Sequence, residues 1–420
     1  MKILLGALLL AAIPATPAFA QACTPGTYAS PDGDFVVLGK SPAVPAPGLR
    51  YLFRDGRRGA TSDTATPFTC GSDTLTVKGE AWKPIAFRET PTTFDSVATK
   101  MSGVLIEPPG APDATRPLVV MVHGSERTSP IGSAYGYAMA AQGVSVFVYD
   151  KRGTGGSEGE YTQNFELLAE DAAHALDHAR SMAAGHYGRS GFFGGSQGGW
   201  VAPLAATRTK ADFVAIGFGL VASPIEEDRE QMVLEVRAAG LGDDAVALVN
   251  RLSQATAGLL LSDFRTGYDA LDAVRREMAD KPWAAKIKGE YSPEIASIPS
   301  DDLRRIGRAR VNNLELIWDY DAVAALKKLD TPLLWVLAGE DRQAPIETTR
   351  GALMGLAKAG KPVDVYLFPD TDHGMFEFTT NADGSRSVTR ITDGYLKLLG
   401  DWIKGDVRGA YGRAEHLTPR

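Results

Sequence analysis

The stretch Ser190-Gly191-Phe192-Phe193-Gly194-Gly195-Ser196-Gln197-Gly198-Gly199-Trp200 decides the fold of this chain. A short apolar run ends in it at a serine, and a helix-like segment begins directly afterwards. Gly194 and Gly198 stand two residues to either side of Ser196, which is the G-x-S-x-G pattern of a strained turn from a strand into a helix. Neighbouring side chains would collide in such a turn. The pattern therefore predicts a nucleophilic Ser196 lifted out of a sheet.

The composition is that of a globular protein, and the first 20 residues have the pattern of an export signal. The chain has 420 residues, of which 44% are hydrophobic and 23% charged, enough for one large core and an accessory region. Residues 1–20 combine a basic start, an apolar run and a small-residue end at Ala18-Phe19-Ala20. We predict a signal peptide cleaved after Ala20 and a periplasmic or secreted protein. The apolar run is shorter than the roughly 20 residues of a membrane span, and a lipoprotein anchor on Cys23 is the alternative.

Cysteine usage and charge limit the partners. Cys23 and Cys70 are the two cysteines, and an oxidising compartment allows them to form a disulfide; two free thiols are the alternative. No metal site is predicted, because the cysteines have no nearby histidines. The formal net charge of -7 argues against nucleic acid and anionic membrane surfaces as partners.

The chain divides into a β-rich start and a larger alternating region. Residues 21–96 contain short alternating runs separated by Gly, Pro, Asp and Ser, which predicts a small β-rich extension. We expect Phe94 and the run Met101 to Glu107 to lie on paired strands that open the main sheet. Residues 97–221 and 317–407 alternate apolar strands with helical patterns, which predicts a mostly parallel sheet with helices on both faces.

Between the two parts of this core, residues 222–316 are too many for one crossover helix. Their apolar residues recur at helical spacing, so we predict an inserted helical cap. Its aromatic residues either pack inside the cap or line a substrate pocket: Phe264, Tyr268, Trp283 and Tyr291. Residues 408–420 are predicted to be a polar tail.

A serine nucleophile requires a base and an acid later in the chain. His373 follows the final predicted strand of the core, where a loop can place it beside Ser196, whereas His416 lies in the polar tail. Glu340 and Asp341 compete for the acid role, because neighbouring side chains in an extended segment point to opposite sides. The shorter stem of Asp341 favours it. Asp370 and Asp372 are the next candidates.

Acyl transfer also needs two backbone donors for the developing oxyanion. Gln197 N–H follows the nucleophile and supplies the first. Ser125 N–H follows His123-Gly124 at the end of an earlier predicted strand, and it is the expected second donor. We interpret His123 as a residue that orients this turn.

Residues 376–389 follow the expected base directly. They alternate on both sides of Asp383-Gly384, which predicts a β-hairpin. Such a hairpin would stand at the mouth of the site, where Phe376 or Phe378 could contact substrate. A surface hairpin without a role is the alternative.

With these motifs the sequence resembles the α/β-hydrolase superfamily, and within it the secreted esterases and the peptidase-like relatives of prolyl oligopeptidases. The resemblance extends from about Met101 to Lys404. It implies Ser196 as nucleophile, Asp341 as acid, four residues before Pro345, and His373 as base. Residues 21–96 are too few for the propeller domain of prolyl oligopeptidases. The resemblance rests on these segments: 123–125, 150–157, 194–199, 339–345 and 372–374.

We therefore predict a serine hydrolase that cleaves small-molecule carboxylic esters through an acyl-enzyme and uses no cofactor. A peptidase or amidase is the alternative enzyme. A non-catalytic binding protein on the same fold is the alternative of another class, although no member of the predicted triad is missing. A nucleotide-binding oxidoreductase is disfavoured, because Glu158 stands where the third glycine of a dinucleotide fingerprint belongs.

Overall fold

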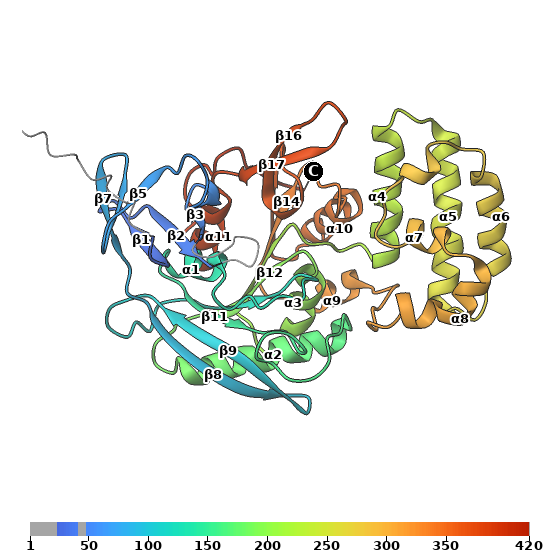
Figure 1. Cartoon of the computed structure of the whole chain (residues 1–420). Helices are drawn as coiled ribbons and strands as arrows, with labels where there is room; N and C mark the ends of the chain where they lie inside the picture. Colours follow the sequence, from blue (N-terminus) through green and yellow to red (C-terminus); the bar gives the residue numbers. More distant parts are fainter. Residues whose placement is uncertain (1–22, 41–47, 420) are drawn as a thin grey trace, which may run out of the picture.

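The computed structural model describes residues 23–40 and 48–419. The predicted signal peptide lies outside the described residues. A central sheet with flanking helices forms the middle of the molecule, a second sheet lies at its N-terminal side, and a group of helices stands apart from the central sheet on the other side (Figure 1). No described helix is both long enough and apolar enough to cross a membrane.

The central sheet has nine strands in the order β18-β15-β14-β13-β12-β10-β11-β9-β8. The six strands from β15 to β11 pair in parallel, whereas β9, β8 and β18 add antiparallel pairs at the two edges. The parallel strands β10 to β14 are apolar and buried, as expected for a sheet covered on both faces. The strands are β8 (Arg88–Ser96), β9 (Thr99–Glu107), β10 (Leu118–Val122), β11 (Ser145–Tyr149), β12 (Ser190–Gly195), β13 (Phe213–Gly217), β14 (Leu333–Ala338), β15 (Val363–Phe368) and β18 (Glu415–Leu417).

Helices cover both faces of this sheet and form two separate apolar clusters with it. One face is covered by α2 (Phe165–Met182), α3 (Gly198–Ala206), α9 (Ala322–Lys328) and α10 (Glu347–Lys358). The other face is covered by α1 (Ala134–Ala140) and α11 (Tyr395–Lys404). This arrangement confirms the predicted mostly parallel sheet with helices on both faces.

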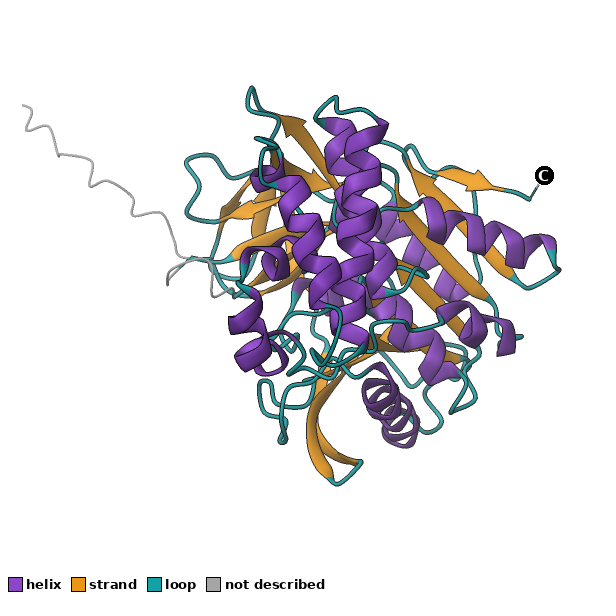
Figure 2. Ribbon diagram, turned by 90° about the vertical axis from the view of Figure 1, so that its right-hand side faces the viewer, coloured by secondary structure: helices purple, strands orange, loops and turns teal. Residues whose placement is uncertain are grey.

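The helices between β13 and β14 form the predicted cap. A capping box of Ser223 and Glu226 starts the first of them. The cap has an apolar cluster of its own, which includes Met232, Leu252 and Leu271. The cap can therefore stand beside the sheet without sharing the core of the sheet. Figure 2 looks from the cap side, with these long helices in front of the sheet. They are α4 (Pro224–Ala238), α5 (Asp243–Leu261), α6 (Tyr268–Met278), α7 (Ser292–Ser297) and α8 (Ser300–Val311).

The N-terminal sheet is antiparallel and has seven strands in the order β4-β3-β2-β1-β7-β6-β5. A disulfide joins Cys23 to Cys70, with Cα atoms 5.2 Å apart, so the predicted pairing is confirmed. Both cysteines pack against the apolar cluster of this sheet. The strands are β1 (Gly26–Ala29), β2 (Phe35–Gly39), β3 (Arg50–Phe53), β4 (Arg58–Ala60), β5 (Phe68–Cys70), β6 (Leu75–Val77) and β7 (Glu80–Pro84).

Two predicted boundaries differ from the structure. The extension assigned to 21–96 ends earlier, because β8 pairs along its whole length with β9 and so belongs to the central sheet. The tail 408–420 is not only a polar tail: β18 pairs with the edge strand β15, and Tyr411 is buried. No pattern in the sequence indicates this strand, because its side chains are polar and an edge strand needs only backbone groups for pairing.

Candidate active site

The turn from β12 into α3 has the strain that the sequence predicts. Ser196 has a φ of +53°, a left-handed conformation that non-glycine residues rarely adopt. A Cβ atom on Gly194 would lie 2.7 Å from the carbonyl oxygen of Gly198, and one on Gly198 would lie 3.1 Å from that of Val122. The two glycines are therefore needed because backbone passes so close to them.

Three side chains from different loops form a hydrogen-bonded series at this turn. His373 Nε2 lies 3.1 Å from Ser196 Oγ, and His373 Nδ1 lies 2.9 Å from Asp341 Oδ2. The histidine follows β15 and the aspartate follows β14, so both loops leave the sheet at the carboxyl ends of parallel strands. The structure thus brings together the three residues that the sequence analysis selected.

The surroundings of Asp341 hold its carboxylate toward the histidine. Its Oδ1 atom accepts hydrogen bonds from the backbone N–H groups of Gln343 and Ala344, at 3.0 and 2.7 Å. Burial raises the pKa of Asp341, while its hydrogen bond with His373 and the Ala344 amide oppose that rise. Burial alone would lower the pKa of His373. The hydrogen bond and charge of Asp341, together with the charges of Asp372 and Glu290, outweigh burial and leave this pKa above its ordinary value.

The competing acids contact other partners. The Glu340 carboxylate lies 2.7 Å from Arg386 Nη2, at the start of strand β17 (Arg386–Ile391). Asp370 pairs with Arg413. His416, the other candidate base, stacks on Tyr366 at the sheet edge.

Asp372 and Arg386 together hold the two loops that carry Asp341 and His373. Asp372 Oδ1 accepts hydrogen bonds from the backbone N–H groups of Arg342 and His373, at 3.0 and 2.9 Å. Arg386 Nη1 lies 2.7 Å from Asp372 Oδ2 and donates to the backbone oxygen of Glu340 at 2.6 Å. One guanidinium therefore connects both loops to the hairpin formed by β16 (Phe376–Thr380) and β17 (Arg386–Ile391).

This hairpin confirms the predicted strand pairing but not the interpretation of its aromatic residues. Phe378 lies beneath the guanidinium of Arg386 at 3.8 Å, and Phe376 lies beneath that of Arg58 at 4.6 Å. Both rings support arginines, and neither lines a cavity beside Ser196.

Both predicted oxyanion residues lie near the serine: Gln197 follows it in the chain, and Ser125 lines the same cavity. Gln197 is the N-cap residue of α3, so its backbone N–H belongs to the positive end of that helix. The loop around Ser125 is held through its carbonyl oxygens. Lys151 Nζ donates to those of Gly124 and Glu126, at 2.6 and 3.2 Å, and the Tyr161 hydroxyl donates to that of Ser125 at 2.5 Å.

His123 anchors the start of the same loop. Its imidazole hydrogen-bonds to the backbone oxygen of Tyr149, and burial lowers its pKa to about 3. A neutral, buried imidazole fits the structural role that the sequence analysis assigned to His123.

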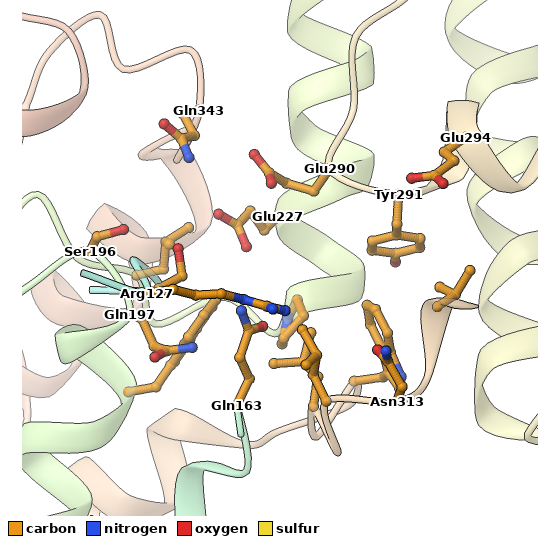
Figure 3. A pocket seen from close by; sticks show the side chains of 18 of the residues that line it. Arg127, Gln163, Ser196, Gln197, Glu227, Glu290, Tyr291, Glu294, Asn313 and Gln343 are labelled. Carbon is orange, nitrogen blue, oxygen red and sulfur yellow. The ribbon is translucent and has the colours of Figure 1, made fainter. Parts of the chain in front are cut away.

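A cavity of about 370 Å³ lies between Ser196 and the cap (Figure 3). Figure 3 shows Ser196 and Gln197 on one wall, with Glu227, Glu290 and Tyr291 across the cavity from them. Ser125 also lines it, whereas the other three cap aromatics do not, so Tyr291 fits the pocket-lining interpretation. The apolar and aromatic part of the lining comprises Trp200, Leu220, Pro224, Tyr291, Val311, Leu314, Leu316 and Trp318.

Sequence reasoning missed the charged part of this lining. Glu227, Glu290 and Glu294 come from the cap, and Arg127 and Arg310 also reach the cavity. Burial and the nearby carboxylates of Glu290 and Asp341 raise the pKa of Glu227 well above its ordinary value. No signal in the sequence identified these residues, because charged residues on cap helices have the pattern of a solvated face. Among the described residues, no group of three or more His, Cys, Asp or Glu side chains could hold a metal ion.

Comparison with known protein families defines the class as α/β hydrolase. The family model described as "Serine aminopeptidase, S33" matches residues 113–377, which include the predicted nucleophile, acid and base. The chain belongs to this hydrolase family. A search of the curated proteins finds no match.

Solved structures with a similar fold include esterases and a peptidase. The Pyrococcus furiosus esterase Pf2001 is 14% identical, with 68% of this chain and 84% of that chain covered and a TM-score of 0.42. The Pyrococcus horikoshii acylaminoacyl peptidase is 15% identical, with 79% and 45% covered and a TM-score of 0.43. Est1E from Butyrivibrio proteoclasticus, solved with ferulic acid, is 16% identical, with 75% and 96% covered and a TM-score of 0.41.

Proposed function

We propose that the protein is a secreted serine hydrolase that cleaves carboxylic esters through an acyl-enzyme on Ser196. The observation that carries the proposal is the series Ser196–His373–Asp341, with hydrogen-bond distances of 3.1 and 2.9 Å. His373 Nε2 takes the hydroxyl proton as Ser196 Oγ attacks the ester carbonyl. Asp341 holds the other ring nitrogen and stabilises the imidazolium that forms. The N–H groups of Gln197 and Ser125 are the proposed oxyanion donors.

The second half of the reaction uses the same groups. His373 returns its proton to the leaving alcohol, and the acyl group remains bonded to Ser196 Oγ. Water then gives a proton to Nε2 and attacks the acyl carbon, the bond to Oγ breaks, and Oγ recovers the proton. The products are the carboxylic acid and the alcohol, and the enzyme is regenerated.

The direct test is a panel of p-nitrophenyl esters of increasing chain length, measured beside aminoacyl and peptidyl anilides. Hydrolysis of the esters with little hydrolysis of the anilides is the expected result. Ser196→Ala is the matched control for background hydrolysis. Cleavage of the anilides alone would contradict the esterase assignment and indicate a peptidase.

An aminopeptidase or amidase is the second candidate, and one observation favours it. The cavity beside Ser196 contains three glutamates, and the pKa of Glu227 is raised by burial and by the other carboxylates that lie near it. A cationic ammonium group on a substrate would pair with these carboxylates in their ionised form. Glu227→Gln should then lower kcat/KM for aminoacyl anilides selectively, while p-nitrophenyl acetate turnover stays unchanged.

Secretion is part of the proposal. It is supported by the Cys23–Cys70 disulfide, since disulfides persist in oxidising compartments. N-terminal sequencing of the exported protein should start at Gln21, and a chain that keeps Met1 after export would contradict cleavage after Ala20.

A further inference from the structure

A second cavity, of about 450 Å³, lies on the histidine side of the site. It is bounded by the cap, by the loops of Asp341 and His373, and by the tip of the hairpin β16–β17. Its lining is polar or charged except for one side chain, Val388, which is 51% exposed. The lining residues are Gln231, Glu235, Lys288, Glu290, Arg342, Gln343, Asp372, His373, Ser385, Arg386 and Val388.

The two cavities divide the proposed reacting groups between them. Ser196 and the proposed oxyanion residues Ser125 and Gln197 line only the first cavity, whereas His373 lines only the second. Glu290 and Gln343 line both, so the cavities adjoin at these two residues. Figure 3 shows both on the same side of the first cavity.

The geometry of acyl transfer then decides which part of a substrate each cavity receives. In the tetrahedral intermediate, the oxyanion faces its backbone donors, and the leaving oxygen must lie within reach of the proton on His373 Nε2. The leaving group therefore extends to the histidine side, into the second cavity. The acyl chain is directed into the first cavity, where the apolar and aromatic side chains lie.

We infer that the second cavity is a leaving-group site, and that it takes a hydrophilic alcohol such as a polyol, while the first cavity takes an apolar or aromatic acyl group. This inference rests on the proposed function. During acylation the bond from Ser196 Oγ to the acyl carbon forms, the bond to the alcohol oxygen breaks, and the proton taken by His373 passes to that oxygen. The free alcohol leaves through the second cavity, and the acyl group stays in the first.

The test varies one half of the substrate at a time. One series keeps a butyryl group and changes the alcohol from glycerol to hexanol; the other keeps p-nitrophenol and lengthens the acyl chain. The rate of acylation is read from kcat/KM, and the rate of deacylation from the common butyryl-enzyme in single-turnover experiments. Val388→Trp partly fills the second cavity, and Leu314→Trp fills the first. Thr380→Trp, on the same hairpin but outside both cavities, is the control.

Wild-type protein should prefer the glycerol ester to the hexyl ester. Val388→Trp should lower kcat/KM for the glycerol ester by about tenfold, the range in which a poorly fitting side chain discriminates between substrates. It should leave deacylation of the butyryl-enzyme unchanged, because the alcohol has already left. Leu314→Trp should instead change deacylation and the dependence on acyl chain length.

The opposite pattern, in which Val388→Trp alters acyl-chain preference and deacylation, would overturn the leaving-group assignment while leaving the esterase proposal intact. A uniform response to all esters, or none, would overturn it as well. A wild-type protein that turns over no ester and forms no acyl-enzyme at Ser196 would overturn the proposed function, and this inference with it.

Discussion

The loops at the carboxyl ends of β14 and β15 and the cap side of the cavity differ in how their polar groups are held. In the loops, Asp341 accepts hydrogen bonds from two backbone amides and lies beside His373, while Arg386 ties both loops together. On the cap side, the buried hydroxyl of Tyr291 has no hydrogen-bond partner among the described residues. The contacts of Asp341 are thus made within the protein before substrate binds, whereas the Tyr291 hydroxyl on the cap side is free to bind a polar group of the substrate. Changes at Asp341 and His373 should affect all substrates equally, and changes in the cap should be selective.

The largest effect is expected at the acid. Asp341→Asn should lower kcat for every ester by about four orders of magnitude, because the amide favours the wrong tautomer of His373. The matched control is Glu340→Gln, which should keep most activity, since Glu340 contacts Arg386 and not His373. Steady-state kinetics of both variants decide between them. A more severe loss in Glu340→Gln would move the acid role to that residue.

Local sequence patterns predict one part of the site, whereas contacts between distant segments determine the rest. Some features of the site are local signals, and a motif of a few residues suffices to find them. They are Gly194 and Gly198 beside the serine, the histidine after the final parallel strand, and the Asp383-Gly384 turn. Arg386 and Lys151 act through contacts with loops far away in the chain, many of them to backbone oxygens. No local pattern identifies such contacts. The charged lining of the cavity depends in the same way on how the cap packs over the sheet.

The next effect concerns the positioning role of Arg386. Arg386→Met should lower kcat by about 10- to 100-fold for p-nitrophenyl esters of every acyl chain length with KM little changed, because it frees the loops that align His373 and Asp341. Arg386→Lys should recover part of the activity. Arg390→Met, on the same strand but paired with Asp55, is the control. A change that depends on acyl chain length, or a loss explained by a lower melting temperature alone, would contradict this role.

A smaller effect is expected from pH. The base must be neutral to accept the Ser196 proton, so activity is lost as pH falls through the pKa of His373. Burial lowers that pKa, but Asp341 and the nearby carboxylates raise it by more, which places the acidic limb of the kcat/KM profile above the ordinary value for imidazole, about 6.5. The same limb should appear for every ester. An acidic limb below the ordinary value would mean that the charge of Asp341 does not reach the ring.

The disulfide should have the smallest effect on catalysis. Cys23 and Cys70 are 47 residues apart, and closing such a loop stabilises a fold by about 4 kcal/mol in the chain-entropy model. Reduction, or the double change to serine, should lower the melting temperature of the N-terminal sheet, as followed by calorimetry. Ester turnover at 25 °C should be unchanged, because both cysteines lie outside the site. Two alkylated thiols in the native protein would contradict the bond.

The most direct test of the central claim is labelling with a fluorophosphonate followed by peptide mapping. The wild-type protein should take up one phosphonyl group, on Ser196, and lose ester turnover in proportion. Ser196→Ala should take up none, yet unfold at nearly the same temperature, because the serine side chain is small and placed for chemistry. Stoichiometric labelling of another serine, or ester turnover that survives in Ser196→Ala, would contradict the account.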